Sequence, residues 1–379
     1  MKSMMSAAGP VSLADPKADL STHREAVLAA LARVIDSGTY ILGPEVEAFE
    51  IEAAQSIGAR GGVGVASGTD ALVLTMVAAG ISMGDEVITV SHTAGATVAA
   101  INLVGAVPVL VDIEEEGYCL GPDCLDGALG PRTKAILPVH LYGQPADLEC
   151  IGDFAKRHSL ALIEDCAQAM GATLHGRKVG SIGDAGCLSF YPTKILGALG
   201  DGGLVVSSDE ELLNRLRRLR TYGWTKPQFA EVPLGRCSRL DEIQAAVLRV
   251  KLDRLEEDLA KRRALAEAYG KAFADLPIVC PCPRHDASHV YHLYVIRCDR
   301  RDDLREFLDR WGIGTGIHYP YPVHLQPGLT ETARIPAPLT VTEKIGKEIL
   351  SLPLYPGLSA ADHGRVIDAV RRFFGKGSS

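Results

Sequence analysis

The chain has 379 residues, of which 47% are hydrophobic and 23% charged, and its formal net charge is −8. This composition is ordinary for a soluble globular protein, and the length favours two lobes over a single core. A net negative charge without a dense Lys/Arg tract argues against a nucleic-acid partner, because a polyanion would be repelled. No stretch of about twenty uncharged apolar residues is present, so we expect no membrane span.

The nine cysteines are scattered along the chain. An odd number without CxxC pairs argues against a disulfide scaffold and against a zinc site, so we expect no bound metal. Free thiols in a reducing cytoplasm explain them most simply. The first ten residues contain no long apolar segment, which leads us to expect no secretory signal and a cytoplasmic location.

Short apolar runs alternate with helical segments between about residues 60 and 210. We predict strands over 61–66, 85–90, 107–113, 134–140, 160–165, 184–190 and 203–208, and helices over 69–80, 96–105 and 148–158. This alternation is typical of βαβ units, and the near-continuous apolar strands indicate a mostly parallel sheet that is buried on both faces.

The flanking regions are more helical. Apolar spacing predicts N-terminal helices near 23–37 and 44–57, a long helix over 239–275, a strand over 290–298, and helices over 302–312 and 340–350. We therefore predict a large α/β domain over residues 1–240, which includes the N-terminal helices. Residues 241–379 would form the long connecting helix and a smaller α+β domain.

Polar residues follow three of the predicted strands, where open parallel sheets bind their ligands. Ser67, Gly68 and Thr69 lie at the start of a helix, where free N–H groups and the helix dipole suit a phosphate. Ordinary helix capping explains the same residues. Because strand side chains alternate, one of Glu164 and Asp165 can face a ligand while the other faces away.

The third strand end carries Lys194, which lies in SFYPTK (189–194) before the glycine-rich segment GALGDGG (197–203). A lysine here can form a Schiff base with pyridoxal phosphate (PLP) and then serve as a proton-transferring base. An aspartate at the preceding strand end can keep the pyridine nitrogen protonated, with Gln168 nearby. A surface lysine is the simpler alternative. The order of the three groups favours PLP chemistry, and no Walker A, GxSxG, HExxH or GxGxxG motif competes.

The sequence resembles the DegT/DnrJ/EryC1/StrS family of PLP-dependent sugar aminotransferases over nearly its whole length. The matching segments are YILGPEVEAFE (40–50), VASGTDALVL (65–74), GDEVIT (84–89), TKAILPVHLYGQPADLE (133–149), LIEDCAQAMGA (162–172), LSFYPTKILGALGDGG (188–203), SRLDEIQAAVL (238–248) and GIHYPYPVH (316–324). The resemblance implies an α/β fold of the fold-type I, aspartate-aminotransferase class. It also implies PLP as cofactor, L-glutamate as amino donor, and a homodimer with active sites at the subunit interface.

The resemblance assigns roles to individual residues. Lys194 is implied as the Schiff-base lysine, Asp165 as the partner of the pyridine nitrogen, and Gln168 as a contact of the ring. The implied phosphate ligands are Gly68, Thr69 and Ser189. The implied substrate contacts are Tyr191, His318 and Tyr319.

Two positions depart from the family pattern. Cys237 stands where relatives often have an asparagine that reaches the partner subunit's phosphate, so the thiol or Arg236 would have to replace that contact. Ala94 stands where relatives commonly have an aromatic residue that stacks on the cofactor ring, and His92 is our candidate to fill the gap. Ile195 also replaces a frequent asparagine.

The expected amino acceptor is a keto-sugar nucleotide, linked to dTDP or UDP. Family members that act at C-3 of the sugar tend to carry SGTDAL and GALGDGG, which occur here at 67–72 and 197–203, so we predict a 3-amino-hexose product. A keto-cyclitol acceptor is the alternative. A sugar dehydratase would have histidine in place of Lys194, and a regulatory, non-enzymatic protein would be expected to have lost the PLP residues.

Overall fold

The computed structural model describes residues 9–375 and centres on one seven-stranded sheet in the order β1-β9-β8-β5-β4-β2-β3. Its strands are β1 (Gly61–Val65), β2 (Glu86–Val90), β3 (Val107–Val111), β4 (Thr133–Ile136), β5 (Ala161–Asp165), β8 (Ala185–Ser189) and β9 (Gly203–Ser207). Strand β9 is antiparallel to both β1 and β8, and the other neighbours are parallel. The prediction of a mostly parallel sheet is confirmed.

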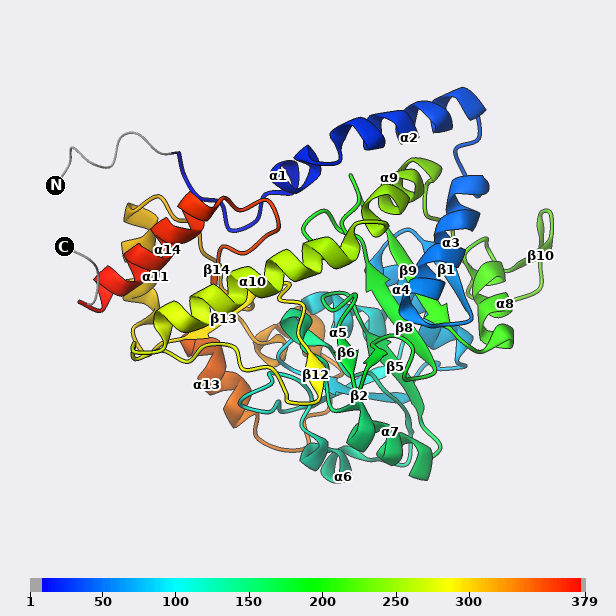
Figure 1. Cartoon of the computed structure of the whole chain (residues 1–379). Coiled ribbons are helices and arrows are strands. Elements are labelled where there is room, and N and C mark those ends of the chain that lie inside the picture. Colours follow the sequence, from blue (N-terminus) through cyan, green and yellow to red (C-terminus); the bar gives the residue numbers. More distant parts are fainter. Residues whose placement is uncertain (1–8, 376–379) are drawn as a thin grey trace.

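Helices surround this sheet and continue into the C-terminal part (Figure 1). They are α1 (Pro16–Ser21), α2 (Arg24–Ser37), α3 (Pro44–Ile57), α4 (Gly68–Ala78), α5 (Gly95–Leu103), α6 (Leu125–Ala128), α7 (Leu148–Arg157), α8 (Glu210–Leu219), α9 (Glu242–Leu252), α10 (Leu255–Phe273), α11 (Arg301–Arg310), α12 (Pro327–Thr330), α13 (Thr340–Glu348) and α14 (Ala360–Phe373). The remaining strands are β6 (Thr173–Leu174), β7 (Arg177–Lys178), β10 (Trp224–Lys226), β11 (Phe229–Ala230), β12 (Ala287–Ser288), β13 (Tyr294–Arg297) and β14 (Ile349–Leu352).

The glycines of β1 permit close packing on one face of the sheet. A Cβ atom at Gly62 would lie 2.9 Å from the carbonyl oxygen of Glu50 in α3, and one at Gly64 would lie 3.0 Å from Cβ of Leu240. Both distances are too short for an ordinary side-chain contact. Gly62 and Gly64 therefore allow α3 and the segment before α9 to pack against the strand.

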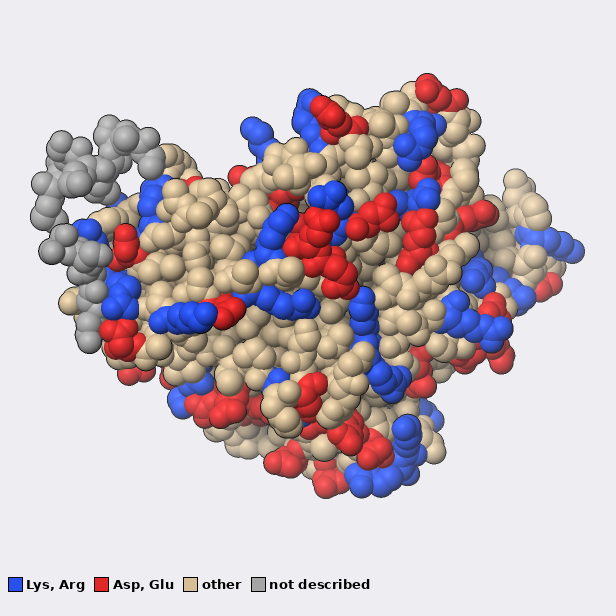
Figure 2. Space-filling model, viewed as in Figure 1, with Lys and Arg blue, Asp and Glu red and all other residues tan. Residues whose placement is uncertain are grey.

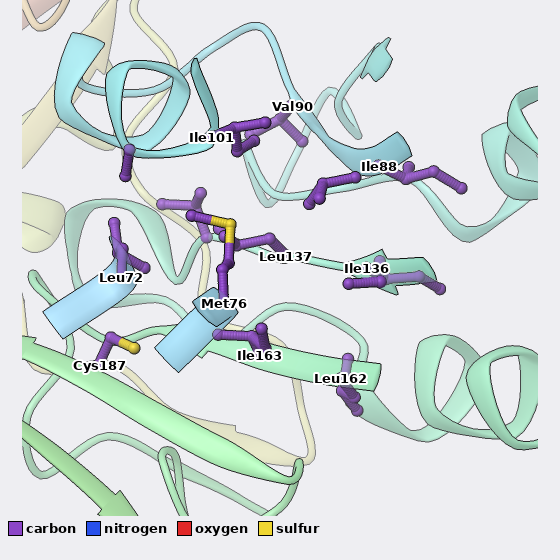
Figure 3. Close-up of a cluster of buried hydrophobic side chains, with 14 of the residues drawn as sticks. Leu72, Met76, Ile88, Val90, Ile101, Ile136, Leu137, Leu162, Ile163 and Cys187 are labelled. Carbon is purple, nitrogen blue, oxygen red and sulfur yellow. The ribbon is translucent and has the colours of Figure 1, made fainter. Parts of the chain in front are cut away.

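The main core fills the space between the sheet and its helices. Figure 3 shows side chains from α4, α5 and four strands meeting in this core, with Met76 near its centre. The central strands lie buried, as their apolar sequences predicted, because helices cover both faces of a parallel sheet. This buried scaffold holds the strand ends in place.

The C-terminal part has its own core, formed by α10, α11, α14 and the paired strands β13 and β14. Residues near the N-terminus join it: Val11 pairs with Ile313, and the amide of Gly357 donates to the Asp19 carboxylate at 2.9 Å. These N-terminal residues therefore lie with the C-terminal part, although the sequence placed them in the first domain. The domain boundary near residue 240 stays a prediction.

Two predicted elements differ from the structure. The predicted long helix is interrupted at Asp253 and Arg254, which separate α9 from α10. Helix α9 packs on α2 and α3, whereas α10 packs on α14, so each helix follows its own neighbours. The predicted helix over 340–350 ends at Glu348, and the chain continues directly as β14 because its backbone pairs with β13.

The surface mixes charges of both signs. Figure 2 shows Lys/Arg and Asp/Glu side chains interspersed over the visible face. Within residues 9–375, no helix is both long and apolar enough to cross a membrane.

Candidate active site

The three predicted polar groups follow β1, β5 and β8. Because these strands run in the same direction, their carboxyl ends lie at one edge of the sheet. Strand β5 ends at Asp165, β8 ends at Ser189, and β1 leads into Ser67. The fold thus brings together residues that are separated by more than one hundred positions in the sequence.

Asp165 is buried at this edge with few hydrogen-bond donors. Its carboxylate accepts one hydrogen bond from the Thr97 hydroxyl at 2.9 Å and one from the backbone N–H of Ala167 at 3.1 Å. Burial raises the pKa of Asp165, while these donors and the nearby Lys194 amine oppose that rise. The site therefore holds an acid that gains from an additional cationic partner.

Lys194 lies in the loop that follows β8, and its charge interacts with that of Asp165. Burial lowers the pKa of its amine, and the charge of Asp165 partly offsets the effect. Residues of α9 hold the loop, because Gln244 accepts from the Leu199 N–H at 2.9 Å and Lys251 donates to the Gly197 carbonyl at 2.5 Å. The lysine thus sits on an anchored loop, with its amine shifted towards the neutral, nucleophilic form.

The turn before α4 packs directly against β8. A Cβ atom at Gly68 would lie 2.6 Å from Cβ of Ser189, so only glycine fits between the two segments. Ser67 caps α4 by accepting from the Asp70 N–H at 3.1 Å. The Ser189 hydroxyl and the first-turn N–H groups at Gly68 and Thr69 consequently form a small cradle of hydrogen-bond donors.

Glu164 faces away from this edge. Its carboxylate accepts from His140 at 3.0 Å and from three backbone N–H groups, those of Gly180, Ile182 and Gly183, at 2.7–2.9 Å. Burial acts to raise its pKa, but these donors outweigh burial and lower it. Of the two acids that end β5, Asp165 is the one that contacts the predicted site.

His140, Glu164 and Cys166 lie close enough together to resemble a metal site. However, His140 Nδ1 accepts from the Ala146 N–H at 3.0 Å, and its Nε2 atom donates to Glu164. Burial raises the pKa of Cys166 well above its usual value, which keeps the thiol protonated. The His140 and Glu164 atoms are therefore engaged with each other and with backbone N–H groups, and the Cys166 thiol beside them stays protonated.

Gln168 connects the loop that follows β4 to the C-terminal part of the chain. Its side-chain oxygen accepts from the Tyr142 N–H at 2.8 Å, and its amide nitrogen donates to the Tyr319 hydroxyl at 2.9 Å. His318, the residue before Tyr319, bonds through Nδ1 to the Ser351 hydroxyl at 2.8 Å. Tyr319 and His318 thus lie beside the predicted cofactor residues, whereas Tyr191 is 53% exposed.

His92 does not line open space in the structure. Its ring is 0% exposed, and its Nε2 atom lies 2.7 Å from the Tyr142 hydroxyl. The two rings meet edge to face, with centroids 6.0 Å apart. The proposed stacking of His92 on the cofactor stays a prediction, and the ring is turned towards Tyr142.

Cys237 is exposed at the surface of the chain. It contacts Arg239, whose guanidinium approaches Sγ to 2.9 Å, and it bridges to Thr221. The next residue, Ser238, donates to the Asp70 carboxylate at 2.8 Å and accepts from the Ala66 N–H at 3.1 Å. This segment therefore supports the start of α4 through Ser238.

Two residues that shape the site were not predicted from the sequence. Thr97 follows Ala94 by three positions, and its spacing from Asp165 gives no indication of their hydrogen bond. Tyr142 follows β4 and has positive backbone φ of 57°. A polar residue after a parallel strand was the available signal, because ligands gather at that edge.

Comparisons with known proteins identify the family of the chain. The model of the DegT/DnrJ/EryC1/StrS aminotransferase family matches residues 21–371. The dTDP-3-amino-3,4,6-trideoxy-alpha-D-glucose transaminase of Micromonospora megalomicea is 45% identical over 92% of this chain and 95% of that protein. The "Erythromycin biosynthesis sensory transduction protein EryC1" of Saccharopolyspora erythraea is 49% identical over 88% of this chain and 92% of its own length.

A crystal structure of S. venezuelae DesV in complex with a ketimine intermediate superimposes with a TM-score of 0.94. It is 45% identical in sequence and covers 98% of this chain and 100% of its own. The expected fold-type I architecture is thereby confirmed. The chain belongs to the DegT/DnrJ/EryC1/StrS aminotransferase family, whose members depend on PLP.

Proposed function

We propose that this protein transfers an amino group from L-glutamate to C-3 of a keto-deoxyhexose nucleotide. The observation that carries the proposal is the convergence of Asp165, Lys194 and the donor cradle at one edge of the sheet. The Micromonospora relative is named for a dTDP-linked 3-amino sugar, which supports a dTDP-linked acceptor. The segments SGTDAL and GALGDGG of this chain favour the same carbon of the sugar.

The residues present fit PLP. The cradle of Gly68, Thr69 and Ser189 would hold the phosphate, because the close packing of Gly68 on Ser189 brings the serine hydroxyl to the start of α4. Lys194 would hold the aldehyde carbon through its amine, and Gln168 lies beside the position expected for the ring. When bound, PLP supplies a carbonyl group that takes up the amino group and a ring that accepts electrons.

The protein's own part in the reaction is to control protons. Asp165, which is buried and accepts only two hydrogen bonds, would keep a proton on the pyridine nitrogen, because a cation there would use the remaining acceptor capacity of the carboxylate. Thr97 orients this carboxylate through its hydroxyl. The Lys194 amine, whose pKa is lowered by burial, would move the proton at Cα of glutamate.

His318 and Tyr319 would form the wall that faces the sugar, and the exposed Tyr191 would meet the substrate at the entrance. Asp70, the acidic residue of the SGTDAL segment, accepts a hydrogen bond from Ser238 and lies 3.6 Å from an Arg236 nitrogen. Asp70 would therefore act on the site through the segment before α9. The relative named for sensory transduction does not favour a regulatory role here, since Lys194, Asp165 and Gln168 are all in place.

The proposal includes a homodimer with shared sites in the cytoplasm. Apolar side chains of α2, α3 and the loop between them are exposed, including Leu28, Ile35, Ile41 and Ile51. The hairpin β10–β11 extends away from the body beside α8 (Figure 1), and Cys237 follows it. Cys237 or Arg236 would then reach the partner subunit's phosphate. If so, Cys237→Asn should bind PLP at least as tightly as wild type, and clearly weaker binding would contradict this placement.

The test is an acceptor panel. Purified enzyme with PLP and glutamate is incubated with matched 3-keto and 4-keto dTDP-hexoses, a 3-keto UDP-hexose and a keto-cyclitol. We expect 2-oxoglutarate release with the 3-keto dTDP sugar and NMR assignment of the new amine to C-3. Turnover of only the 4-keto sugar would overturn the regiochemistry, and turnover of only the cyclitol would establish the alternative acceptor. Release of 2-oxoglutarate with the UDP sugar alone would show that the acceptor is linked to UDP and not to dTDP.

A further inference from the structure

Tyr142 occupies a junction between three segments that are distant in the sequence. It is 2% exposed and follows β4. Its backbone N–H donates to Gln168, its hydroxyl donates to the carbonyl oxygen of His318, and the same hydroxyl contacts His92. One residue therefore joins the loops after β2 and β5 to the segment that precedes Tyr319.

The direction of these hydrogen bonds follows from the number of protons available. The His318 carbonyl can only accept, so the single proton of the Tyr142 hydroxyl is committed to it. His92 Nε2 must then be the donor to Tyr142, which leaves Nδ1 unprotonated and without a hydrogen-bond partner. Burial lowers the pKa of His92 to about 4, in agreement with a neutral ring. Burial also raises the pKa of Tyr142 well above its usual value, so its hydroxyl stays a donor.

The segment that receives this bond is anchored at three points. The His318 ring bonds to Ser351 in β14, the His318 carbonyl accepts from Tyr142, and the Tyr319 hydroxyl accepts from Gln168. The first anchor belongs to the C-terminal part, and the other two belong to the loops at the edge of the large sheet. The distance between the cofactor residues and the wall at 318–319 is thus set by hydrogen bonds from both sides.

We propose that His92 and Tyr142 form a one-directional hydrogen-bond relay that positions the His318–Tyr319 wall for the sugar acceptor. Neither residue would touch the reacting atoms, so both are positioning residues. The inference rests on the proposed function in placing the sugar at this wall. Amino transfer needs the acceptor carbon close to the attacking nitrogen, and a misplacement of about 1 Å costs about 100-fold in rate.

Tyr142→Phe tests the relay with little other change. Phenylalanine keeps the ring and the left-handed backbone, and the N–H still donates to Gln168, so only the hydroxyl is lost. The two half-reactions are measured separately: the glutamate half by the absorbance of the cofactor, and the sugar half by amination of the keto-sugar nucleotide. We expect kcat/KM of the sugar half to fall by about tenfold or more, with the glutamate half changed by less than about threefold.

His92 provides a second variant pair. Glutamine offers a side-chain N–H near the position of Nε2, whereas leucine offers none, so His92→Gln should retain sugar-half activity that His92→Leu loses. Because both residues act in one relay, the double variant His92→Leu/Tyr142→Phe should resemble either single variant. Additive losses would contradict a shared relay.

Tyr269→Phe is the matched control. Tyr269 is also a fully buried tyrosine whose hydroxyl donates to a backbone carbonyl, that of Pro353 at 2.9 Å, but it lies in the C-terminal core. Its loss should leave the ratio of the two half-reactions unchanged. An altered ratio in Tyr269→Phe would mean that the loss of any buried tyrosine hydroxyl affects the sugar half-reaction more than the glutamate half-reaction. That result would overturn the positioning role of Tyr142.

Amide hydrogen exchange tests the hydrogen-bond relay independently of the sugar substrate. Peptides spanning 316–321 should exchange faster in Tyr142→Phe and His92→Leu than in wild type or Tyr269→Phe. Unchanged exchange together with unchanged half-reactions would overturn the relay. If the exchange differs but wild-type enzyme aminates no keto-sugar nucleotide, the relay is present and the sugar assignment has failed.

Discussion

The two carboxylates that end β5 are adjacent in sequence and both are buried, yet they have opposite surroundings. Glu164 accepts four hydrogen bonds, which lower its pKa, whereas Asp165 accepts two, and burial raises its pKa. The first is saturated and belongs to the scaffold. The second keeps bonding capacity for a cation that the protein itself does not fully provide. Unmet bonding capacity therefore distinguishes the proposed functional acid from the structural one.

The largest effect is expected at Lys194, the group that faces the unsaturated acid. Lys194→Ala removes both the covalent attachment and the proton-transferring amine, so we expect kcat to fall by about 10³-fold or more with the fold intact. Borohydride reduction of wild-type holoenzyme followed by peptide mapping should place the cofactor on Lys194. A label on a different lysine would refute the assignment.

The next prediction compares the two acids in catalysis. Asp165→Asn should lower kcat by about 10²–10³-fold, since a neutral amide cannot keep the ring nitrogen protonated equally well. Glu164→Gln serves as the matched variant on the opposite face, and its folded fraction should retain near wild-type kcat. The measurement is turnover per folded, PLP-loaded active site. A large loss of kcat in Glu164→Gln with a small loss in Asp165→Asn would show that Glu164, and not Asp165, is the functional acid.

The same pair should differ in stability, with opposite signs. Glu164→Gln breaks a buried, paired charge and should destabilise the fold by about 3–5 kcal/mol. Asp165→Asn should raise the melting temperature of the PLP-free protein, because the native state holds this carboxylate at a raised pKa and hence disfavours its charge. Thermal unfolding at neutral pH measures both effects.

Acid titration sharpens this comparison. The pKa of Glu164 is lower in the folded protein than its usual value of 4.5, so its stabilisation is present above about pH 4.5 and is lost as the pH falls through the folded pKa. Glu164→Gln should therefore lose less stability than wild type over this acid range. Asp165 contributes in the opposite direction, because its folded pKa is raised. Identical pH dependence of wild type and Glu164→Gln would contradict the saturated carboxylate.

The smallest effect is expected from the donors to Asp165. Thr97→Val removes a hydrogen bond to a charged group, which is worth about 1.5–3 kcal/mol, so we expect kcat to fall about tenfold. Thr97→Ser should restore activity. Thr93, whose hydroxyl lies 2.9 Å from that of Thr97, provides the control, and Thr93→Val should have the weaker effect. Equal losses in both variants would show that packing, rather than the hydrogen bond to Asp165, is affected.

The sequence could predict much of the candidate site because the ligand-binding residues of a parallel sheet lie where strands end. The alternation of apolar runs and helices placed Asp165, Ser189 and Lys194 at such ends, and the structure brings them to one edge with Gly68. Local patterns also predicted α2 and α3 with little error. These features depend on neighbouring residues, which the sequence displays directly.

Tertiary structure decided the features that depend on residues far apart in the chain. Strand alternation allowed either acid to face the site, and the residue-level choice of Asp165 follows from which face receives the 180–183 loop and which receives Thr97. The break between α9 and α10 likewise depends on packing partners far away in the sequence, and the Tyr142 hydroxyl donates to a carbonyl 176 positions away. The number of hydrogen bonds that a buried carboxylate accepts depends on partners from distant parts of the chain. The sequence by itself therefore determined which acids could serve in the site, and the packing of the chain determined which of them keeps acceptor capacity for a ligand.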